Sequence, residues 1–593
     1  MHDNYADRIH ALRNWMNNMA MDALIIPHAD EFLGEYTPTH NKRLHWVTGF
    51  TGSDGIAVIT RENAVIFVDG RYTVQVRKQV PAEMFEYRHL IEDPILQWLL
   101  DTLPDSSKVA IDPKLHSINW LADAEKAVAD KLLLRYINDN PIDMLWNNRP
   151  APLVTDAILI GIDVAGQSSK NKRVNIGKSI INADVSYLSQ LDSICWLLNI
   201  RGGDVSHLPV LLSHALIDTE GNVNLFLDPA RIPKNFDEHV GTGVTVLLPE
   251  VLESSLAALS SKTVLVDPLT SNAWVSQVLH QIGANIVHAP DPCLLPKATK
   301  NATEIAGFKA CHIRDGIAVS RFLAWLDTQV TDGNLPNEAE LSDMLYLFRT
   351  LDETFTDLSF DTISAASGNA AICHYNHLHQ PDPSKLELNN VYLVDSGGQY
   401  RDGTTDITRT IAIGECSNEV KTAFTLVLKG HIALSTARFP RGTCGSQLDS
   451  LARQHLWAYG FDYDHGTGHG VGHFLSVHEG PQRITKAPNT VALLPGMVLS
   501  NEPGYYRANA FGIRIENLEL VVEVPTSGDM TMMGFESLTR VPIDRRLVDT
   551  ALLIDREITW WNDYHLSVWQ DISPSLQLSD AEWLKQATAP LAR

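Results

Sequence analysis

The sequence predicts a multidomain protein that combines α/β and α+β architecture. A chain of 593 residues is too long for one hydrophobic core, so we expect two to four domains. Strand and helix signals alternate over roughly the first 300 residues, whereas long helices and glycine-rich strands dominate the rest. The composition, with 44% hydrophobic and 20% charged residues, is typical of an ordinary globular protein.

The first predicted domain, residues 1–146, has the pattern of an α/β layer. DALIIPH (22–28) and KVAIDP (108–113) predict short apolar strands, and GIAVITRENAVIFVDGRY (55–72) predicts two strands around a polar turn. A helix is expected at about 73–87. Strands therefore alternate with helices, as in a sheet covered by helices.

The second predicted domain, residues 147–296, partly repeats the first. A stretch rich in proline and asparagine at 140–153 is the candidate linker between them. Trp46 precedes GFTGSDG and a hairpin that ends FVDGRY, while Trp196 precedes NIRGGDV and a hairpin that ends FLDPAR. This weak repeat indicates two similar α/β domains in tandem.

The third predicted domain, residues 297–540, begins with a long helix. Asn301 and Glu304 have the spacing of a capping box at the start of that helix. Glycine-rich strands separate the helices of this domain, which are predicted at 304–330, 336–350, 417–435 and 446–459.

The last segment, residues 541–593, contains three tryptophans in EITWWNDYHLSVWQ. Large aromatic side chains in a terminal segment indicate that it docks onto another surface. That surface is either the protein's own third domain or a second subunit, and the sequence leaves both alternatives open.

Bulk properties exclude several classes of function. A formal net charge of −24 argues against binding a nucleic-acid backbone, whose phosphates need cationic partners. No apolar run reaches the ~18 residues of a membrane span, and the polar N-terminus lacks the apolar core of a signal peptide. We therefore expect a cytoplasmic protein that binds neither nucleic acid nor membrane.

The six cysteines indicate reduced thiols rather than a disulfide framework or a zinc ribbon, because none has CxxC spacing. Cys373 lies beside His374, which raises a Cys/His nucleophile as an alternative. Adjacent residues on a strand point to opposite faces, so the pattern disfavours this pairing.

Five residues of the third domain carry the predicted chemistry, namely Asp395, Asp406, His469, Glu502 and Glu516. A set so rich in oxygen donors suits two hard divalent cations, such as manganese, better than one zinc. Two such cations can hold a hydroxide and use it on a carbonyl at neutral pH. The pattern therefore predicts a hydrolase.

Two aspartates are predicted to meet in a hairpin. Asp395 ends the strand NNVYLVD, and Asp406 begins the strand TTDITRTIAI after a turn at RDGT. Their carboxylates would lie side by side and repel each other unless a cation lies between them. The alternative is a pair of solvated aspartates beside a turn, where aspartate is common.

The two candidate glutamates lie in different contexts. Glu516 shares one face of the strand GIRIENLEL with Arg514, which we expect to orient or partly neutralise it; a surface ion pair is the alternative. Glu502 follows the strand MVLS at a bend imposed by Pro503 and Gly504, a position that favours function.

Histidines gather in two segments, HGTGHGVGHFLSVH (465–478) and HYNHLH (374–379). His465 and His469 have the spacing of a helical zinc pair, but the intervening glycines oppose a helix. Glycines allow close backbone approach, which suits a substrate channel lined by imidazoles. Hydrogen bonding to substrate is therefore favoured over an independent metal site for both clusters.

The order Asp, Asp, His, Glu, Glu within DGTTDITRT, HGTGHGVG, NEPGYY and GIRIEN resembles that of the metallopeptidases with the pita-bread fold. The resemblance covers nearly the whole chain. KRLHWVTGFTGSDGIAVITRENAVIFVDGRY, LDSICWLLNIRGGDVSHLPVLLSHALI and LVDTALLIDREITWWNDYH are similar to the three-domain cytosolic aminopeptidases P. This implies two tandem creatinase-like α/β domains, then a pita-bread catalytic domain with a C-terminal extension.

The resemblance also implies a site for two divalent metal ions, with Mn(II) as the expected metal. Asp395 and Asp406 would hold one ion, and His469 with Glu502 would complete the other. Asp406 and Glu516 would bridge the two ions.

The implied activity is release of the N-terminal residue from peptides that begin Xaa-Pro, with a hydroxide between the metals as the nucleophile. Separately, the tryptophan-rich terminal segment leads us to expect a homodimer. His374, His465 and His478 match substrate-binding and proton-shuttling histidines, and Arg514 matches a site arginine. Glu502 would take the proton of the nucleophile and deliver it to the prolyl nitrogen, with His478 assisting at the oxyanion.

The chain departs from this pattern at two places. The loop from 374 to 395 is longer by one residue and carries His377 and His379, and His473 stands where a small residue is expected. Neither departure removes a predicted ligand. We expect both to affect only the substrate pocket or how tightly an adventitious metal binds.

Other activities fit less well. A prolidase, which cuts only Xaa-Pro dipeptides, is disfavoured by the extra N-terminal domain, and a methionine aminopeptidase is disfavoured by length. A catalytically inactive binding module and a creatinase-like amidinohydrolase would not need the complete set of five ligands.

Overall fold

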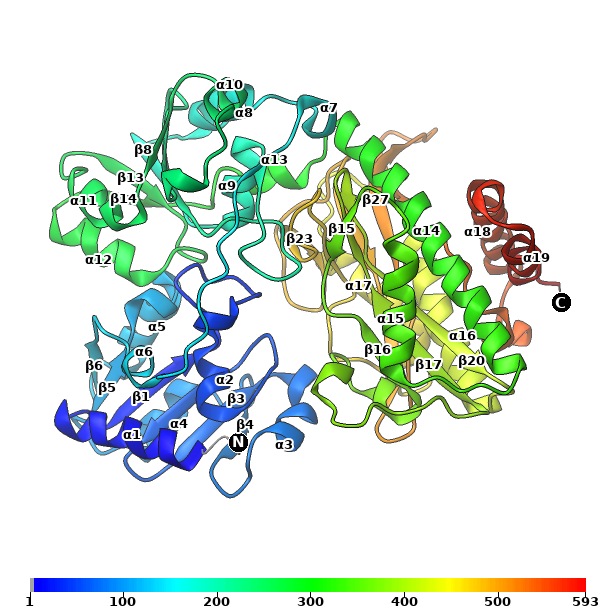
Figure 1. Ribbon diagram of the computed structural model, residues 1–593, viewed down its shortest axis with the longest axis horizontal. Helices are drawn as coiled ribbons and strands as arrows, with labels where there is room; N and C mark the ends of the chain where they lie inside the picture. The colour runs from blue at the N-terminus through cyan, green and yellow to red at the C-terminus, as the bar shows by residue number, and fades with distance from the viewer. Residues whose placement is uncertain (1–4, 593) are drawn as a thin grey trace. The chain divides into compact units, whose positions relative to one another are not determined.

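The computed structural model describes residues 5–592 and divides into two compact units (Figure 1). The first unit comprises residues 1–162 and 167–294, and the second comprises residues 163–166 and 295–593. None of the described helices is both long and apolar enough to cross a membrane.

The first unit contains two mixed six-stranded sheets. In the first sheet the order is β4-β3-β2-β1-β5-β6, where β1–β2 and β2–β3 are antiparallel and the other pairs are parallel. The strands are β1 (Ala23–Pro27), β2 (Ile56–Thr60), β3 (Ala64–Val68), β4 (Glu86–His89), β5 (Lys108–Ile111) and β6 (Leu133–Tyr136).

The second sheet repeats this topology. Its order is β12-β11-β10-β8-β13-β14, where β8–β10 and β10–β11 are antiparallel and the other pairs are parallel. The predicted pair of similar α/β domains in tandem is thereby confirmed. The strands are β8 (Val185–Leu188), β10 (His214–Asp218), β11 (Val223–Phe226), β12 (Val244–Leu247), β13 (Thr263–Val266) and β14 (Asn285–His288).

Apolar side chains cover both faces of the first sheet, which explains the short unbroken apolar strands. In β1, Leu24 and Ile26 belong to one core cluster, whereas Ala23 and Ile25 belong to another. The helices of this unit are α1 (Tyr5–Asn18), α2 (Arg43–Thr48), α3 (Gln75–Gln79), α4 (Ile95–Thr102), α5 (Ile118–Val128), α6 (Pro141–Leu145), α8 (Ser169–Ser179), α9 (Leu191–Leu198), α10 (Phe236–Val240), α11 (Leu252–Ala257) and α12 (Ala273–Gln281).

Two expectations for the first unit need correction. The helix expected at about 73–87 is confined to α3, because Pro81 holds the preceding Val80 in an extended conformation and β4 follows. Part of the predicted linker at 140–153 is helical, since the side chain of Asn140 caps α6.

The second unit contains two three-stranded sheets, a six-stranded sheet and a two-stranded sheet. Their orders are β15-β18-β19, β16-β17-β20, β21-β28-β27-β24-β22-β23 and β25-β26. The strands are β15 (Phe355–Leu358), β16 (Ile363–Ala366), β17 (Asn390–Ser396), β18 (Gly398–Tyr400), β19 (Gly403–Thr404), β20 (Ile407–Ile413), β21 (Phe439–Pro440), β22 (Gly468–Gly470), β23 (Glu479–Ile484), β24 (Val498–Asn501), β25 (Gly504–Arg507), β26 (Phe511–Arg514), β27 (Asn517–Val524) and β28 (Met532–Ser537).

The four helices predicted for this unit are present. The longest, α14, begins at the predicted capping box, in which Asn301 and Glu304 exchange side-chain to backbone hydrogen bonds. The helices are α14 (Ala302–Thr331), α15 (Glu338–Arg349), α16 (Asn418–Ser435) and α17 (Asp449–Trp457).

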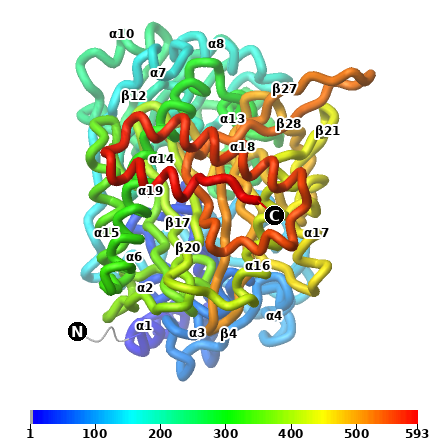
Figure 2. The backbone as a smooth tube through the Cα atoms, turned by 90° about the vertical axis from the view of Figure 1, so that its right-hand side faces the viewer, coloured from blue at the N-terminus to red at the C-terminus, as the bar shows by residue number. Residues whose placement is uncertain are grey.

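The C-terminal extension packs against its own unit. It forms α18 (Asp555–Ile572) and α19 (Leu578–Ala587), shown in red in Figure 2, where α18 contacts α14 and α16. Trp561 is fully buried in a core cluster that also contains Phe424 and Ile513. The sequence leaves two docking surfaces open for this segment. Trp561 packs against the first of them, the protein's own domain.

Candidate metal centre

The hairpin that is expected to join Asp395 and Asp406 is present, although its connection is not a simple turn. β17 and β20 pair antiparallel along their whole length. The residues between them form β18 and β19, which belong to a separate sheet with β15. Both aspartates lie at the same end of the hairpin and are buried.

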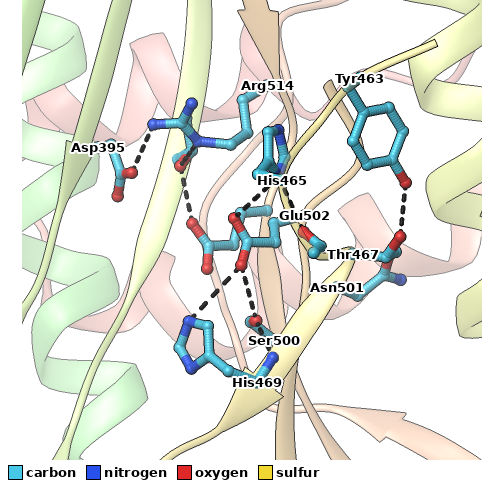
Figure 3. Close-up of polar contacts among 12 residues, drawn as sticks. Asp395, Tyr463, His465, Thr467, His469, Ser500, Asn501, Glu502 and Arg514 are labelled. Atoms are coloured by element: carbon cyan, nitrogen blue, oxygen red, sulfur yellow. Dashed lines mark hydrogen bonds and ion pairs between the residues drawn. The ribbon is translucent and has the colours of Figure 1, made fainter. Parts of the chain in front are cut away.

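Arg514 binds Asp395 rather than Glu516, which corrects the expected pairing. Its Nη2 donates to Asp395 Oδ2 at 2.6 Å (Figure 3). The other oxygen of this carboxylate, Oδ1, is buried and has no hydrogen-bond partner among the described residues. A buried acceptor without a donor is costly, so this oxygen is available to a cation.

Thr408 connects Arg514 with Glu516. Arg514 Nε donates to Thr408 Oγ1 at 3.0 Å, and Thr408 Oγ1 donates to Glu516 Oε2 at 2.7 Å. The continuous strand expected through these residues is interrupted, because β26 ends at Arg514 and β27 begins at Asn517. A shared hydroxyl therefore places both side chains at the site.

His469 and Glu502 are brought together on neighbouring strands. His469 Nδ1 donates to the carbonyl of the next residue at 2.9 Å, which leaves Nε2 3.5 Å from Asp406 Oδ2 and 3.6 Å from Glu502 Oε1. Ser500 Oγ donates to Glu502 Oε1 at 3.2 Å (Figure 3). A Cβ at Gly468 would lie 2.0 Å from the Ser500 carbonyl, so this close approach requires glycine.

Candidate ligand atoms form three overlapping groups. Within each group, all the ligand atoms lie within 4.8 Å of one another. The first two correspond to the two expected metal positions, and the third adds His478 to the site. Asp395, Asp406 and Glu516 are buried, whereas the other members are partly exposed. The groups are Asp395 with Asp406 and Glu516, His469 with Glu502 and Glu516, and Asp406 with His469 and His478.

The electrostatics of these side chains fit bound cations. Burial, together with the charges of Asp406, Glu502 and Asp395, raises the pKa of Glu516 well above its usual range. Burial and the charge of Asp406 raise the pKa of Asp395 to about 6, although Arg514 lowers it. Burial lowers the pKa of His469, but Asp406 and Glu502 raise it to about 9 overall. Carboxylates crowded in this way repel one another until a cation lies between them.

His465 is fixed by hydrogen bonds on both ring nitrogens. Its Nδ1 donates to the Gly466 carbonyl at 2.8 Å, so Nε2 accepts from the Tyr506 hydroxyl, also at 2.8 Å. Tyr506 in turn accepts from Arg514 Nη1 at 2.6 Å. Burial and the charges of Arg514 and nearby His374 lower the pKa of His465 well below its usual range, so the ring is neutral.

The other histidines lie in different surroundings. The ring centroid of His478 is 4.3 Å from that of His469, with the two planes at 69°. His473 is buried against Phe308 of α14, at 5.5 Å between ring centroids. His377 is buried in a short 3-10 helix, and His379 is exposed.

Cys373 is a protonated thiol. Burial raises its pKa to about 11. Because only the thiolate attacks carbonyls, this supports rejection of the Cys/His nucleophile.

Three hydroxyl residues that contact the site are missing from the sequence-based set, namely Thr408, Ser500 and Tyr506. Two of them carry a usable signal, because Thr408 lies two residues after Asp406 and Ser500 two residues before Glu502. A spacing of two places side chains on the same face of an extended segment. The contact of Tyr506 depends on how β25 pairs with β26, which the motif does not reveal.

Comparison with known proteins identifies the family. Residues 306–523 match metallopeptidase family M24, and 531–591 match the C-terminal region of peptidase_M24. Residues 8–135 and 148–304 each match a creatinase/prolidase N-terminal domain. A protein from Laccaria bicolor named probable Xaa-Pro aminopeptidase P is 39% identical, with 99% of this chain and 94% of that protein covered. The chain belongs to metallopeptidase family M24.

Two further proteins match along all or nearly all of the chain. Aminopeptidase P2 of Arabidopsis thaliana is 37% identical, with 97% of this chain and 87% of that protein covered. The crystal structure of X-prolyl aminopeptidase from Caenorhabditis elegans, described as a cytosolic enzyme with a di-nuclear active site, is 32% identical with a TM-score of 0.95. The match covers all of both chains. The predicted creatinase-like domains and M24 catalytic domain are confirmed.

Membership of family M24 makes the chain a metallopeptidase, as predicted. The residues present fit two divalent cations, because the centre offers four carboxylates and an imidazole, and no described residue donates to Asp395 Oδ1.

Proposed function

We propose that the chain is a dinuclear metallo-aminopeptidase that releases the N-terminal residue from peptides with proline at the second position. One observation carries the proposal: within residues 5–592, the carboxylate-rich centre keeps a buried carboxylate oxygen, Asp395 Oδ1, to which no group donates. Full-length similarity to proteins named Xaa-Pro aminopeptidase P supports the choice of substrate.

The groups of candidate ligand atoms support the following ligand assignment. Asp395 and Asp406 would hold one ion, His469 and Glu502 the other, and Asp406 and Glu516 would bridge both. Mn(II) is the proposed metal, because oxygen donors outnumber the single imidazole. Bound divalent cations would supply activation of water at neutral pH and polarisation of the scissile carbonyl.

Glu502 is the proposed proton carrier. It is partly exposed, and its Oε2 lies 4.0 Å from His465 Nδ1 while its Oε1 lies 3.6 Å from His469 Nε2. Burial raises its pKa, so its carboxylate accepts a proton more readily than an exposed glutamate does. It would pass this proton to the prolyl nitrogen as the peptide bond breaks.

His374, His465, His478 and Arg514 are the proposed substrate-binding residues. His465 is held in one orientation through Tyr506 and Arg514, so little rotational freedom is lost when substrate binds. His478, which stacks edge-to-face with His469, would donate to the substrate oxygen as it gains negative charge. Specificity would come from a pocket that accepts the proline ring.

Several broader proposals accompany this activity. Homology to a cytosolic enzyme and the net charge of −24 support a cytoplasmic protein without nucleic-acid or membrane partners. We also propose a homodimer. The proposed domain limits are 1–146, 147–296, 297–540 and 541–593, which resemble the ranges of the family matches.

Two alternatives make different predictions. A prolidase would cut only dipeptides, and the full-length similarity to aminopeptidases P disfavours it. An inactive binding module would not need all five of the proposed ligands, and the groups of candidate ligand atoms count against it.

The test is peptide cleavage by protein stripped of metal and then given Mn(II). Release of the first residue from an Arg-Pro-Pro peptide is compared with cleavage of the dipeptide Gly-Pro. Manganese-dependent release from the longer peptide, with poor cleavage of the dipeptide, is the expected result. Cleavage of the dipeptide alone would indicate a prolidase. If the metal-bound protein cleaves neither peptide, a binding role would be indicated. Asp395→Asn is the matched inactive control.

A further inference from the structure

Arg409 lies on the opposite face of β20 from the metal centre. Side chains alternate along a strand, so Asp406 and Thr408 face the site while Arg409 faces away. Arg409 is 2% exposed, and no carboxylate side chain accepts from its guanidinium among the described residues. Neutral oxygens instead satisfy all five of its N–H groups.

Two of these bonds hold the backbone of the site. Arg409 Nη1 donates to the Glu516 carbonyl at 2.6 Å and to the Thr408 carbonyl at 2.9 Å. Nη2 donates to Asn517 Oδ1 at 2.9 Å, on the residue that follows the ligand. One rigid guanidinium thus fixes Glu516 and Thr408, whose side chains are hydrogen-bonded to each other on the site face.

The remaining hydrogen bonds join the Arg409 guanidinium to acceptors in the C-terminal extension. Arg409 Nε donates to the Pro542 carbonyl at 3.0 Å, and Nη2 donates to the Val541 carbonyl at 2.8 Å. Nη2 also donates to the hydroxyl of Tyr564 in α18 at 3.0 Å. The Tyr564 hydroxyl donates to the Val541 carbonyl at 2.7 Å, which closes a ring of hydrogen bonds around the guanidinium.

Burying a guanidinium without a carboxylate partner is unfavourable. Burial lowers the pKa of Arg409. The guanidinium lies behind Glu516, because it binds the backbone carbonyl of that residue from the face opposite the site.

We propose that Arg409 is a positioning residue that holds the bridging ligand Glu516 from behind. Tyr564 completes its hydrogen bonds, so the C-terminal extension sets the metal affinity of the catalytic domain. This inference rests on the proposed metal centre and goes beyond it, since it assigns a role in metal binding to a segment that contributes no ligand.

Arg173 in the first unit is a matched control. It is also 2% exposed, and it donates to the carbonyls of Gly221 and Val240, each at 2.7 Å. Burial lowers its pKa as well. Replacement of Arg173 therefore reproduces the loss of a buried guanidinium at a place without metal ligands.

The experiment compares Arg409→Lys, Tyr564→Phe and Arg173→Lys. Mn(II) affinity is measured by calorimetric titration of metal-free protein, and kcat and KM are measured at saturating Mn(II). We expect Arg409→Lys to weaken Mn(II) binding about 10- to 100-fold and Tyr564→Phe to weaken it severalfold, as for other groups that orient metal ligands. KM for peptide should stay within about twofold of wild type, and excess Mn(II) should restore part of kcat, because binding contacts remain intact.

Wild-type Mn(II) affinity in a folded Arg409→Lys would overturn the inference, as would equal losses of affinity in Arg409→Lys and Arg173→Lys. If Arg409→Lys does not fold, Tyr564→Phe decides: unchanged Mn(II) affinity would remove the role of the extension. Failure of the wild-type protein to bind Mn(II) would contradict the proposed function itself, which keeps the two failures distinct.

Discussion

Asp204 in the first unit and Asp395 in the second are both buried carboxylates, but their surroundings differ. Asp204 accepts from Arg231 Nη2 at 2.6 and 2.7 Å and from the backbone amides of Thr155 and Leu212. Asp395 accepts from Arg514 through one oxygen only, and its other charged neighbours include carboxylates. The first arrangement is complete by itself, whereas the second becomes complete only when cations bind.

Glu519 shows a third way to accommodate a buried carboxyl group. It is 1% exposed on β27, and no arginine or lysine pairs with it among the described residues. Burial raises its pKa to about 7, so a proton neutralises it through much of the acidic range. These three buried carboxyl groups are thus accommodated differently: Asp204 by an arginine, Glu519 by a proton and Asp395, as we propose, by metal ions as well as an arginine.

The largest effect is expected for Glu516→Gln. Loss of a bridging ligand should reduce kcat/KM at least about 100-fold, because even groups that only orient ligands give losses of this size. The free energy of unfolding of the metal-free protein should stay equal or rise by about 1 kcal/mol, since one of the crowded charges is removed. Peptide cleavage and urea unfolding without metal test both parts. A large loss of metal-free stability would show that Glu516 is structural.

Asp204→Asn should have the opposite profile. Breaking a buried, fully bonded ion pair leaves Arg231 without its partner, which should lower the free energy of unfolding of the first unit by about 3 kcal/mol. Mn(II) affinity and kcat per folded molecule should not change. Weaker Mn(II) binding in this variant would mean that the Asp204–Arg231 pair of the first unit affects the metal centre of the second.

Glu519→Gln tests neutralisation by a proton. The folded state holds the proton of Glu519 up to about pH 7, whereas the unfolded chain releases it near 4.5, so wild-type stability falls as the pH rises through this window. The variant should match wild type near pH 4.5 and exceed it by up to about 3 kcal/mol at pH 8. Urea unfolding of the second unit at both pH values measures the difference. A Glu519→Gln variant that is less stable than wild type at pH 8 would contradict the claim that the Glu519 carboxylate has no cationic partner.

Much of the catalytic unit could be predicted because its signals are local. The capping box at Asn301 marks the start of α14, and the strand around Asp395 and the glycine-rich segment around His469 indicate these two candidate ligands without any long-range information. Glu502 and Glu516 have the same kind of signal at strand ends.

The parts that could not be predicted depend on contacts between distant segments. Arg514 pairs with Asp395, 119 residues away, only because β17, β20 and β26 come together in the folded unit. The hydrogen bonds from Arg409 to the C-terminal extension span more than 130 residues and leave no periodic trace. In the first unit, Pro81 is the local signal that should have shortened the helix expected at 73–87.

The most direct test of the account is the number of Mn(II) ions bound per chain. Metal-free protein is equilibrated with Mn(II), freed of weakly bound metal and analysed by elemental mass spectrometry, with Glu516→Gln in parallel. We predict two ions per chain in wild type, fewer in the variant, and a higher unfolding temperature when metal is bound. A folded wild-type protein that retains no Mn(II) would contradict the claim that cations complete the carboxylate centre.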